Sequence, residues 1–141
     1  MDVDPDEFPL PPYYDTIGIE VTEVEPGAAT GRMPVTSAVS ASPSELIAHG
    51  GAVASLADSV GYWAVSAAND FATTPTIDLR VDYLAPATDD LTATAAVIRN
   101  GASVGVADVE VETADTVVAT ARGVFKTGGG DGDSAWEAPE R

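Results

Sequence analysis

The chain has 141 residues, 45% of them hydrophobic, which is the size and composition of one folded domain rather than of a disordered chain. It has no Cys and a single His, so disulfides, zinc–thiolate sites, cysteine nucleophiles and any centre that needs two imidazoles are excluded. The 23 acidic and 6 basic residues give a formal net charge of −17, and such a surface repels nucleic acid and anionic membranes.

This charge also indicates the solvent in which the protein works. Self-repulsion weakens the compact state in dilute buffer, and salt screens it. We therefore expect a protein of a salt-rich cytoplasm, as in a halophile, with an acidic protein of ordinary cytoplasm as the alternative. The acidic start of the sequence, MDVDPDEFPLPPYYD, lacks the pattern of a signal peptide, which favours a cytoplasmic location.

The two ends of the sequence differ from its middle. Residues 1–16 are rich in Pro and Asp and predict a segment with a short helical turn, which its aromatic side chains could dock onto a core. Residues 127–141 predict a flexible acidic tail. We expect a single domain over residues 17–126, because no repeat or linker interrupts them.

Six segments predict strands. In the second half, hydrophobic and polar residues alternate with period two, and Thr and Val are frequent, as is typical of strands with one solvated face. A hairpin across Glu25–Gly27 and the strong turn signal Asn100–Gly101 fit the same reading. The predicted strands are Gly18–Val24, Ala28–Val35, Thr76–Leu84, Leu91–Arg99, Val104–Glu112 and Thr116–Lys126.

One long segment, Leu46–Asn69, does not alternate. It is dominated by small residues, and Asp58 is its only formally charged group. A transmembrane helix is the competing interpretation at this length, but a central Asp costs about 2.5–3.5 kcal/mol on insertion scales. We predict a helix from about Gly51 to Ala68 that is buried nearly all round. The expected fold is α+β, with a six-stranded antiparallel sheet wrapped around one long central helix.

The candidate chemistry is a carboxylate in a buried helix whose start is rich in glycine. Burial disfavours an ionised Asp58, so this carboxylate is either bonded to a nearby group or kept for a reaction. The pair Gly50–Gly51 follows His49 at the helix start, where amide N–H groups lack intrahelical partners and can stabilise an oxyanion. Considered alone, each of these residues also has an ordinary structural interpretation. Asp58 would be bonded within the helix, and His49 would cap it.

Asp58 lies about seven residues beyond Gly51, roughly 10–12 Å along the helix axis, so it cannot easily reach an atom held at its own helix start. Two antiparallel helices packed side by side would place Asp58 of one chain near Gly50 of the other. The spacing therefore predicts a homodimer with shared sites.

These residues carry a resemblance. H-G-G-A-V-A-S-L-A-D-S from His49 to Ser59 closely resembles the helix start of hotdog-fold acyl-CoA thioesterases, within them most of all the phenylacetate-pathway and 4-hydroxybenzoyl-CoA type. T-I-D-L-R-V-D-Y-L-A-P-A from Thr76 to Ala87 is similar to the following strand of that family. The resemblance covers roughly residues 14–126, and it implies a hotdog fold and a tetramer built from two dimers.

The resemblance also implies roles. Asp58 falls on the catalytic carboxylate, which acts as general base on water or as nucleophile. Gly50 would donate the N–H that polarises the thioester oxygen, His49 would shape that pocket, and Thr76 would help to hold the water. The family commonly has Asn where this chain has Pro43, so its neighbours Ser42 and Ser44 become candidate substitutes.

The substrate side is predicted from fewer signals. Coenzyme A carries phosphates, for which basic side chains are the candidates, although each base could simply offset nearby acids. The acyl pocket would be lined from the helix and the loop before it. The substrate-binding candidates are Gly51, Ser42, Ser44, Leu46, Ile47, Tyr62, Trp63, Arg80, Arg99, Arg122 and Lys126.

We expect no cofactor beyond the coenzyme A of the substrate, and no metal, because the acidic pairs lack calcium-loop spacing. The leading hypothesis is an acyl-CoA thioesterase for aryl or medium-chain acyl groups. A non-catalytic acyl-CoA-binding module is the alternative, favoured by Pro43 and opposed by Asp58. Hydration of an enoyl-CoA on the same fold is a third hypothesis, which the H-G-G motif suits less well.

Overall fold

The computed structural model describes residues 9–128, so the predicted tail lies outside it from residue 129 onward. A short helix, a hairpin and a 3-10 turn precede the long helix, and four strands follow it. The elements are α1 (Pro12–Ile17), β1 (Glu20–Glu25), β2 (Ala28–Met33), η1 (Ser37–Val39), α2 (Gly50–Ala67), β3 (Thr76–Tyr83), β4 (Leu91–Asn100), β5 (Val104–Thr113) and β6 (Thr116–Lys126).

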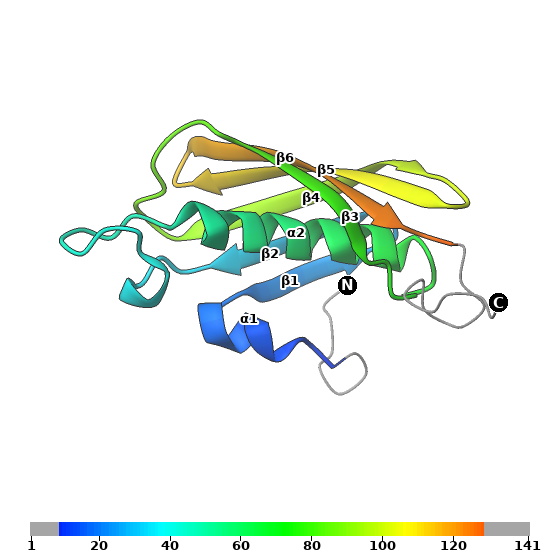
Figure 1. The fold of residues 1–141 in the computed structure, drawn as a ribbon, viewed down its shortest axis with the longest axis horizontal. Helices are drawn as coiled ribbons and strands as arrows, with labels where there is room; N and C mark the ends of the chain where they lie inside the picture. Colours follow the sequence, from blue (N-terminus) through cyan, green and yellow to red (C-terminus); the bar gives the residue numbers. More distant parts are fainter. Residues whose placement is uncertain (1–8, 129–141) are drawn as a thin grey trace.

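The strands form one antiparallel sheet in the order β1-β2-β4-β5-β6-β3, which curls over α2 (Figure 1). This confirms the predicted six-stranded sheet around one helix. The chain leaves α2 and enters β3 at the far edge of the sheet, and β4 to β6 then fill the gap between β2 and β3 as a meander. One edge strand, β1, therefore comes from the hairpin before α2, and the other, β3, is the strand that directly follows α2.

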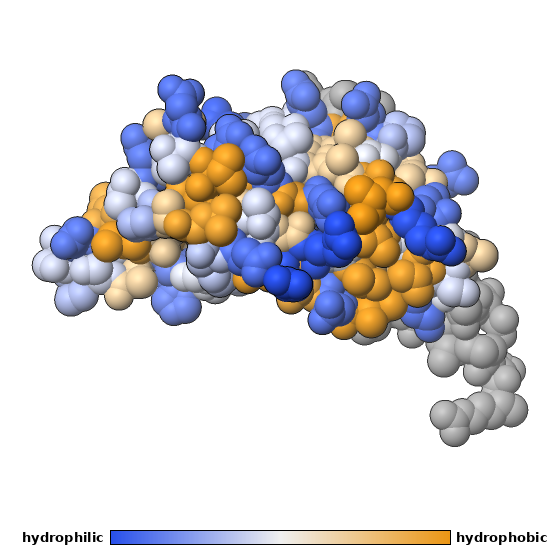
Figure 2. Space-filling model, turned by 90° about the horizontal axis from the view of Figure 1, so that it is seen from above, coloured by the Kyte–Doolittle hydropathy of each residue, from blue (hydrophilic) through white to orange (hydrophobic). Residues whose placement is uncertain are grey.

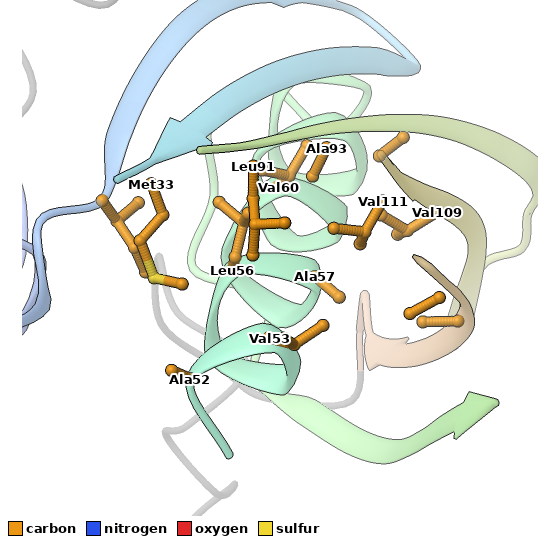
Figure 3. Packing of buried hydrophobic residues seen from close by; sticks show 14 of the residues in the cluster. Met33, Ala52, Val53, Leu56, Ala57, Val60, Leu91, Ala93, Val109 and Val111 are labelled. Atoms are coloured by element: carbon orange, nitrogen blue, oxygen red, sulfur yellow. The ribbon is translucent and has the colours of Figure 1, made fainter. Parts of the chain in front are cut away.

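The core lies between α2 and the inner face of the sheet. Leu56 and Val60 of α2 are fully buried and point toward strand residues such as Leu91 and Val111 (Figure 3). Glycine lets helix and sheet approach closely, because a Cβ on Gly31 would lie 2.8 Å from Cγ2 of Val60. Each large apolar side chain buried in this way contributes roughly 1.5–3 kcal/mol.

The composition of α2 predicted a helix buried nearly all round, and this prediction is wrong. One stripe is open or half-buried, because α2 rests on the sheet along its other sides only. The members of this stripe recur at helical spacing, and most are small or polar: Gly51, Ala54, Ser55, Asp58, Ser59 and Tyr62. The stripe therefore places Asp58 on the side of α2 that the sheet does not cover.

The outer face of the sheet carries mixed charges. Strand alternation and register place every Lys and Arg of residues 9–128 on this face, opposite the buried side: Arg32, Arg80, Arg99, Arg122 and Lys126. Asp, Glu and Thr surround them, and Figure 2, which looks onto the molecule from above, shows hydrophilic side chains between separate hydrophobic areas. The guanidinium of Arg122 meets both carboxylate oxygens of Asp108 at 2.7 and 3.0 Å and holds the pKa of that carboxyl below its usual range.

Candidate active site

Asp58 is joined to the strand that follows the helix. The hydroxyl of Thr76, the first residue of β3, donates a hydrogen bond of 2.7 Å to Oδ1 of Asp58. Burial raises the pKa of Asp58 above its ordinary range, and the Thr76 bond opposes that rise. The carboxylate thus has one oxygen oriented by Thr76, while Oδ2 has no protein donor among the described residues.

A hollow of about 420 Å³ lies beside Asp58. Its walls come from α1, from the open stripe of α2 and from the segment that leads into β3, and they are rich in aromatic and proline side chains. The lining residues are Pro9, Pro11, Tyr13, Tyr14, Ser55, Asp58, Ser59, Tyr62, Trp63, Thr73, Pro75 and Thr76. A carboxylate with a raised pKa in a mostly apolar hollow is the arrangement expected of a catalytic acid or base.

The α1 side of the hollow is fixed by two tyrosines. The hydroxyls of Tyr13 and Ser55 lie 2.8 Å apart, and the Trp63 indole N–H donates to the Tyr14 hydroxyl at 3.1 Å. Burial raises the pKa of Tyr14, so its phenol stays protonated. Sequence reasoning gave these tyrosines only a docking role, because nothing in the residue spacing reveals that α1 lies over Asp58.

The start of α2 presents one free amide. His49 caps the helix, with its ring Nδ1 accepting the Gly51 N–H at 2.8 Å. The next two amides, of Ala52 and Val53, both point to the His49 carbonyl oxygen. Within residues 9–128 the Gly50 N–H meets no acceptor, which leaves it as the amide available to a ligand.

Asp58 and Thr76 are therefore brought together, and so are His49, Gly50 and Gly51, but the two groups stand apart within one chain. Asp58 lies eight positions after Gly50 in α2, about 12 Å at the rise of an α-helix. The structure also reveals a residue that sequence reasoning missed at the helix start: Tyr83 of β3 donates its hydroxyl to the Gly50 carbonyl oxygen at 2.6 Å.

The other predicted binding residues lie in two further places. Ser42 accepts the N–H groups of Ser44 and Glu45 at 3.3 Å each, so its hydroxyl organises the loop before α2. Ser42, Pro43, Ser44 and Leu46 line a separate hollow of about 420 Å³ in that loop. Tyr62 and Trp63 do line the Asp58 hollow, whereas Ile47 does not.

The four basic candidates, Arg80, Arg99, Arg122 and Lys126, all lie on the outer face of the sheet. Lys126 is the one beside Thr76 in the sheet, since Phe125 pairs with Thr76 and the Lys126 N–H donates to the Pro75 carbonyl oxygen at 2.8 Å.

Residues 9–128 contain no cluster of three or more His, Asp or Glu side chains able to hold a metal ion. No helix among them has the length and apolarity needed to cross a membrane.

A six-stranded antiparallel sheet curled over one long central helix is the hotdog fold. Residues 47–120, more than half of the chain, match the family model described as the thioesterase superfamily. The chain belongs to the thioesterase superfamily.

Relatives agree with this family. A Halobacterium salinarum protein described as a putative esterase is 40% identical over 121 aligned positions, and the match covers 78% of this chain and 80% of that protein. Among solved structures, a conserved protein of Pseudomonas aeruginosa superposes with a TM-score of 0.78 at 25% identity, covering 83% of this chain and 94% of its own. A thioesterase of Haemophilus influenzae shares the fold, with a TM-score of 0.73 at 23% identity and coverage of 81% and 80%.

Proposed function

We propose that the protein is an acyl-CoA thioesterase that hydrolyses an aryl or medium-chain acyl-CoA to the free acid and coenzyme A. The observation that carries the proposal is the half-buried Asp58, held by Thr76 at the edge of the aromatic hollow. A binding module has no evident need for an ionisable group in this position, since burial disfavours its charged form.

The proposed reaction uses the free oxygen of Asp58. Asp58 takes a proton from water, and the hydroxide oxygen bonds to the thioester carbon. The Gly50 N–H of a second copy of the chain hydrogen-bonds the carbonyl oxygen as it gains negative charge. The carbon–sulfur bond then breaks, and the proton passes from Asp58 to the thiolate. Direct attack by the Asp58 carboxylate, followed by hydrolysis of the anhydride, is the alternative route through the same residues.

We infer that two copies build each site by pairing their β3 strands. This edge strand has no neighbour on its outer side within the described chain, and it exposes Ile77 by 57%, Tyr83 by 54% and the following Leu84 by 60%. One end of β3 contacts Asp58 through Thr76, and the other end contacts Gly50 through Tyr83. Antiparallel pairing of two β3 strands would bring the Thr76 end of one copy to the Tyr83 end of the other, and Asp58 toward the partner's Gly50.

The acyl group would occupy the hollow beside Asp58. Its walls include the rings of Tyr62 and Trp63, which pack edge-to-face with centroids 5.5 Å apart, and the two tyrosines of α1. An apolar hollow of about 420 Å³ suits an aryl or medium-chain acyl group better than a long fatty chain.

Lys126 is the base we propose for the phosphates of coenzyme A, because it lies beside Thr76. A Lys126→Gln variant should raise the KM for acyl-CoA about two- to fivefold, the size of an exposed ion pair. Acyl-pantetheine, which lacks the nucleotide phosphates, should show no change. The Arg32→Gln variant, on the same face but toward the β1 edge, serves as the matched control. Equal KM shifts for both thioesters would contradict this assignment.

The function is tested by thiol release from a panel of aryl and alkyl acyl-CoAs in molar KCl. Hydrolysis is expected, and the best substrate would define the acyl hollow. A folded protein that binds acyl-CoA but releases no thiol would overturn the proposal in favour of the binding module, for which the Pro43 loop is the supporting feature.

Salt should change both the activity and the stability of the protein. The net charge of −17 and the confinement of the described bases to one face leave the helix side and its loops with acidic charges only. We therefore propose a halophilic, cytoplasmic enzyme. Its activity and unfolding temperature should rise as KCl increases from about 0.1 M to about 3 M, because screening weakens self-repulsion and substrate repulsion. A steady fall of both quantities over this range would contradict the proposal.

A further inference from the structure

Three hydrogen bonds fix the turn that leads into α2. The Ala48 N–H donates to the Ala87 carbonyl oxygen at 2.8 Å, and the His49 N–H donates to the Val39 carbonyl oxygen at 2.7 Å. The third bond, from the Tyr83 hydroxyl to the Gly50 carbonyl oxygen, is the shortest at 2.6 Å. The first two of these bonds join backbone groups, and only the third is made by a side chain. That side chain, Tyr83, reaches the turn from the exposed edge strand β3.

Tyr83 acts on the first peptide groups of the helix. The peptide between Gly50 and Gly51 is held at both ends, since its N–H donates to His49 Nδ1 and its oxygen accepts from Tyr83. The phenol ring also covers Gly50 closely, because a Cβ there would lie 3.2 Å from Cζ and Oη of Tyr83. The preceding peptide supplies the free Gly50 N–H, so its direction depends on how the held peptide is oriented.

We propose that Tyr83 is a positioning residue for thioester hydrolysis: its hydroxyl orients the start of α2 so that the Gly50 N–H points at the thioester oxygen. This inference rests on the proposed function. A donor contributes to catalysis only when it is already aimed at the oxyanion, and small misplacements have large effects on rate. Because Tyr83 belongs to the edge of β3, pairing of two chains along that edge would also set the direction of this amide.

The test separates the hydroxyl from the ring. Tyr83→Phe keeps the ring against Gly50 and removes only the hydrogen bond. We expect kcat to fall about tenfold or more, with KM changed less than about twofold, since the lost alignment matters chiefly in the transition state. Thr22→Val is the matched control, because it removes another hydroxyl-to-carbonyl bond, to Thr30 at 3.1 Å, on the opposite edge of the sheet.

A double variant shows whether Tyr83 acts through the amide. Gly50→Pro removes the N–H, so in that background Tyr83→Phe should cause no further loss of kcat. A native kcat in Tyr83→Phe, or a full additional loss in the double variant, would overturn the proposal.

A second measurement does not need activity. The Gly50 and Gly51 amide resonances should shift, and their hydrogen exchange should accelerate, in Tyr83→Phe but not in Thr22→Val. Unchanged glycine amides would refute the positioning role even in a chain that hydrolyses no thioester. An inactive native protein whose glycine amides do respond would instead overturn the proposed function alone.

Discussion

The Asp58→Asn variant is expected to hydrolyse its best thioester about 10²-fold or more slowly than the native protein, the loss typical of a positioned base. The amide can still accept the Thr76 hydroxyl, so the geometry in the hollow should persist while the capacity to take a proton is lost. The measurement is single-substrate kinetics in molar KCl. Equal rates in both proteins would mean that Asp58 is structural and that the reaction occurs elsewhere.

The raised pKa of Asp58 fixes the direction of two pH effects. As a base, Asp58 must be ionised, so the native rate should rise with pH, with a midpoint above the ordinary Asp value of about 3.9. At pH well below this value the carboxyl is neutral in both the folded and the unfolded states. Above the raised pKa it is charged in both, and burial then destabilises the folded state.

Asp58→Asn should consequently increase the free energy of unfolding at neutral pH, and the increase should disappear as the pH falls. Denaturant unfolding at about pH 7 and about pH 4 in molar KCl measures both parts. A variant that is less stable than native protein at pH 7 would show that the carboxylate has stabilising partners in the assembled protein. Loss of activity together with a gain in stability would identify Asp58 as a residue kept for chemistry.

Gly50→Pro should lower kcat about 10²- to 10³-fold, because it removes the proposed oxyanion donor. Proline is tolerated at the first position of a helix, and His49 already has the extended ψ of 139° that a residue before proline requires. Gly50→Ala is the matched control, since it introduces the same Cβ beside Tyr83 but keeps the N–H. If both variants lose activity equally, crowding rather than the missing donor is responsible.

The same variant tests whether the site is shared. Asp58→Asn and Gly50→Pro chains should each be inactive alone, but co-refolding them should restore about one quarter of the native activity. Half of the resulting two-fold dimers are mixed, and each mixed dimer has one intact site of two. A site built within one chain would give no recovery.

Much of the fold could be predicted from the sequence, because local patterns determine it. The alternation of hydrophobic and polar residues in Val104–Glu112 and the small residues of Gly51–Ala68 each specify an element within a residue or two of its observed bounds. The identity of Asp58 as the unusual group followed from the same pattern, since a charge in an apolar helix needs a reason.

What the sequence could not predict depends on contacts between distant segments. Asp58 was expected to bond within its helix or to face a reaction, and nothing in the residue spacing predicted its bond to Thr76, for which the family resemblance implied only a role in holding water. The roles of Tyr14 and Tyr83 had no local signal in the sequence. Tyr14 contacts α2 only because α1 packs on it, and Tyr83 contacts α2 only because β3 takes its place at the edge of the sheet. The prediction that α2 is buried nearly all round was wrong for a related reason, because the composition of a helix does not show which of its sides the sheet leaves open.

The two edges of the sheet differ in a way that limits how far strands can be added. At the β1 edge, Glu20, Glu23 and Glu25 are exposed, and the register shifts between Val21 and Glu23, a combination that repels and misaligns an incoming strand. The β3 edge also shifts its register, between Thr76 and Asp78, but it is regular from there to Tyr83 and it exposes apolar side chains. In the dimer proposed above, pairing of the two β3 strands would leave only the acidic β1 edges free, so the assembly would be a closed pair rather than a fibre.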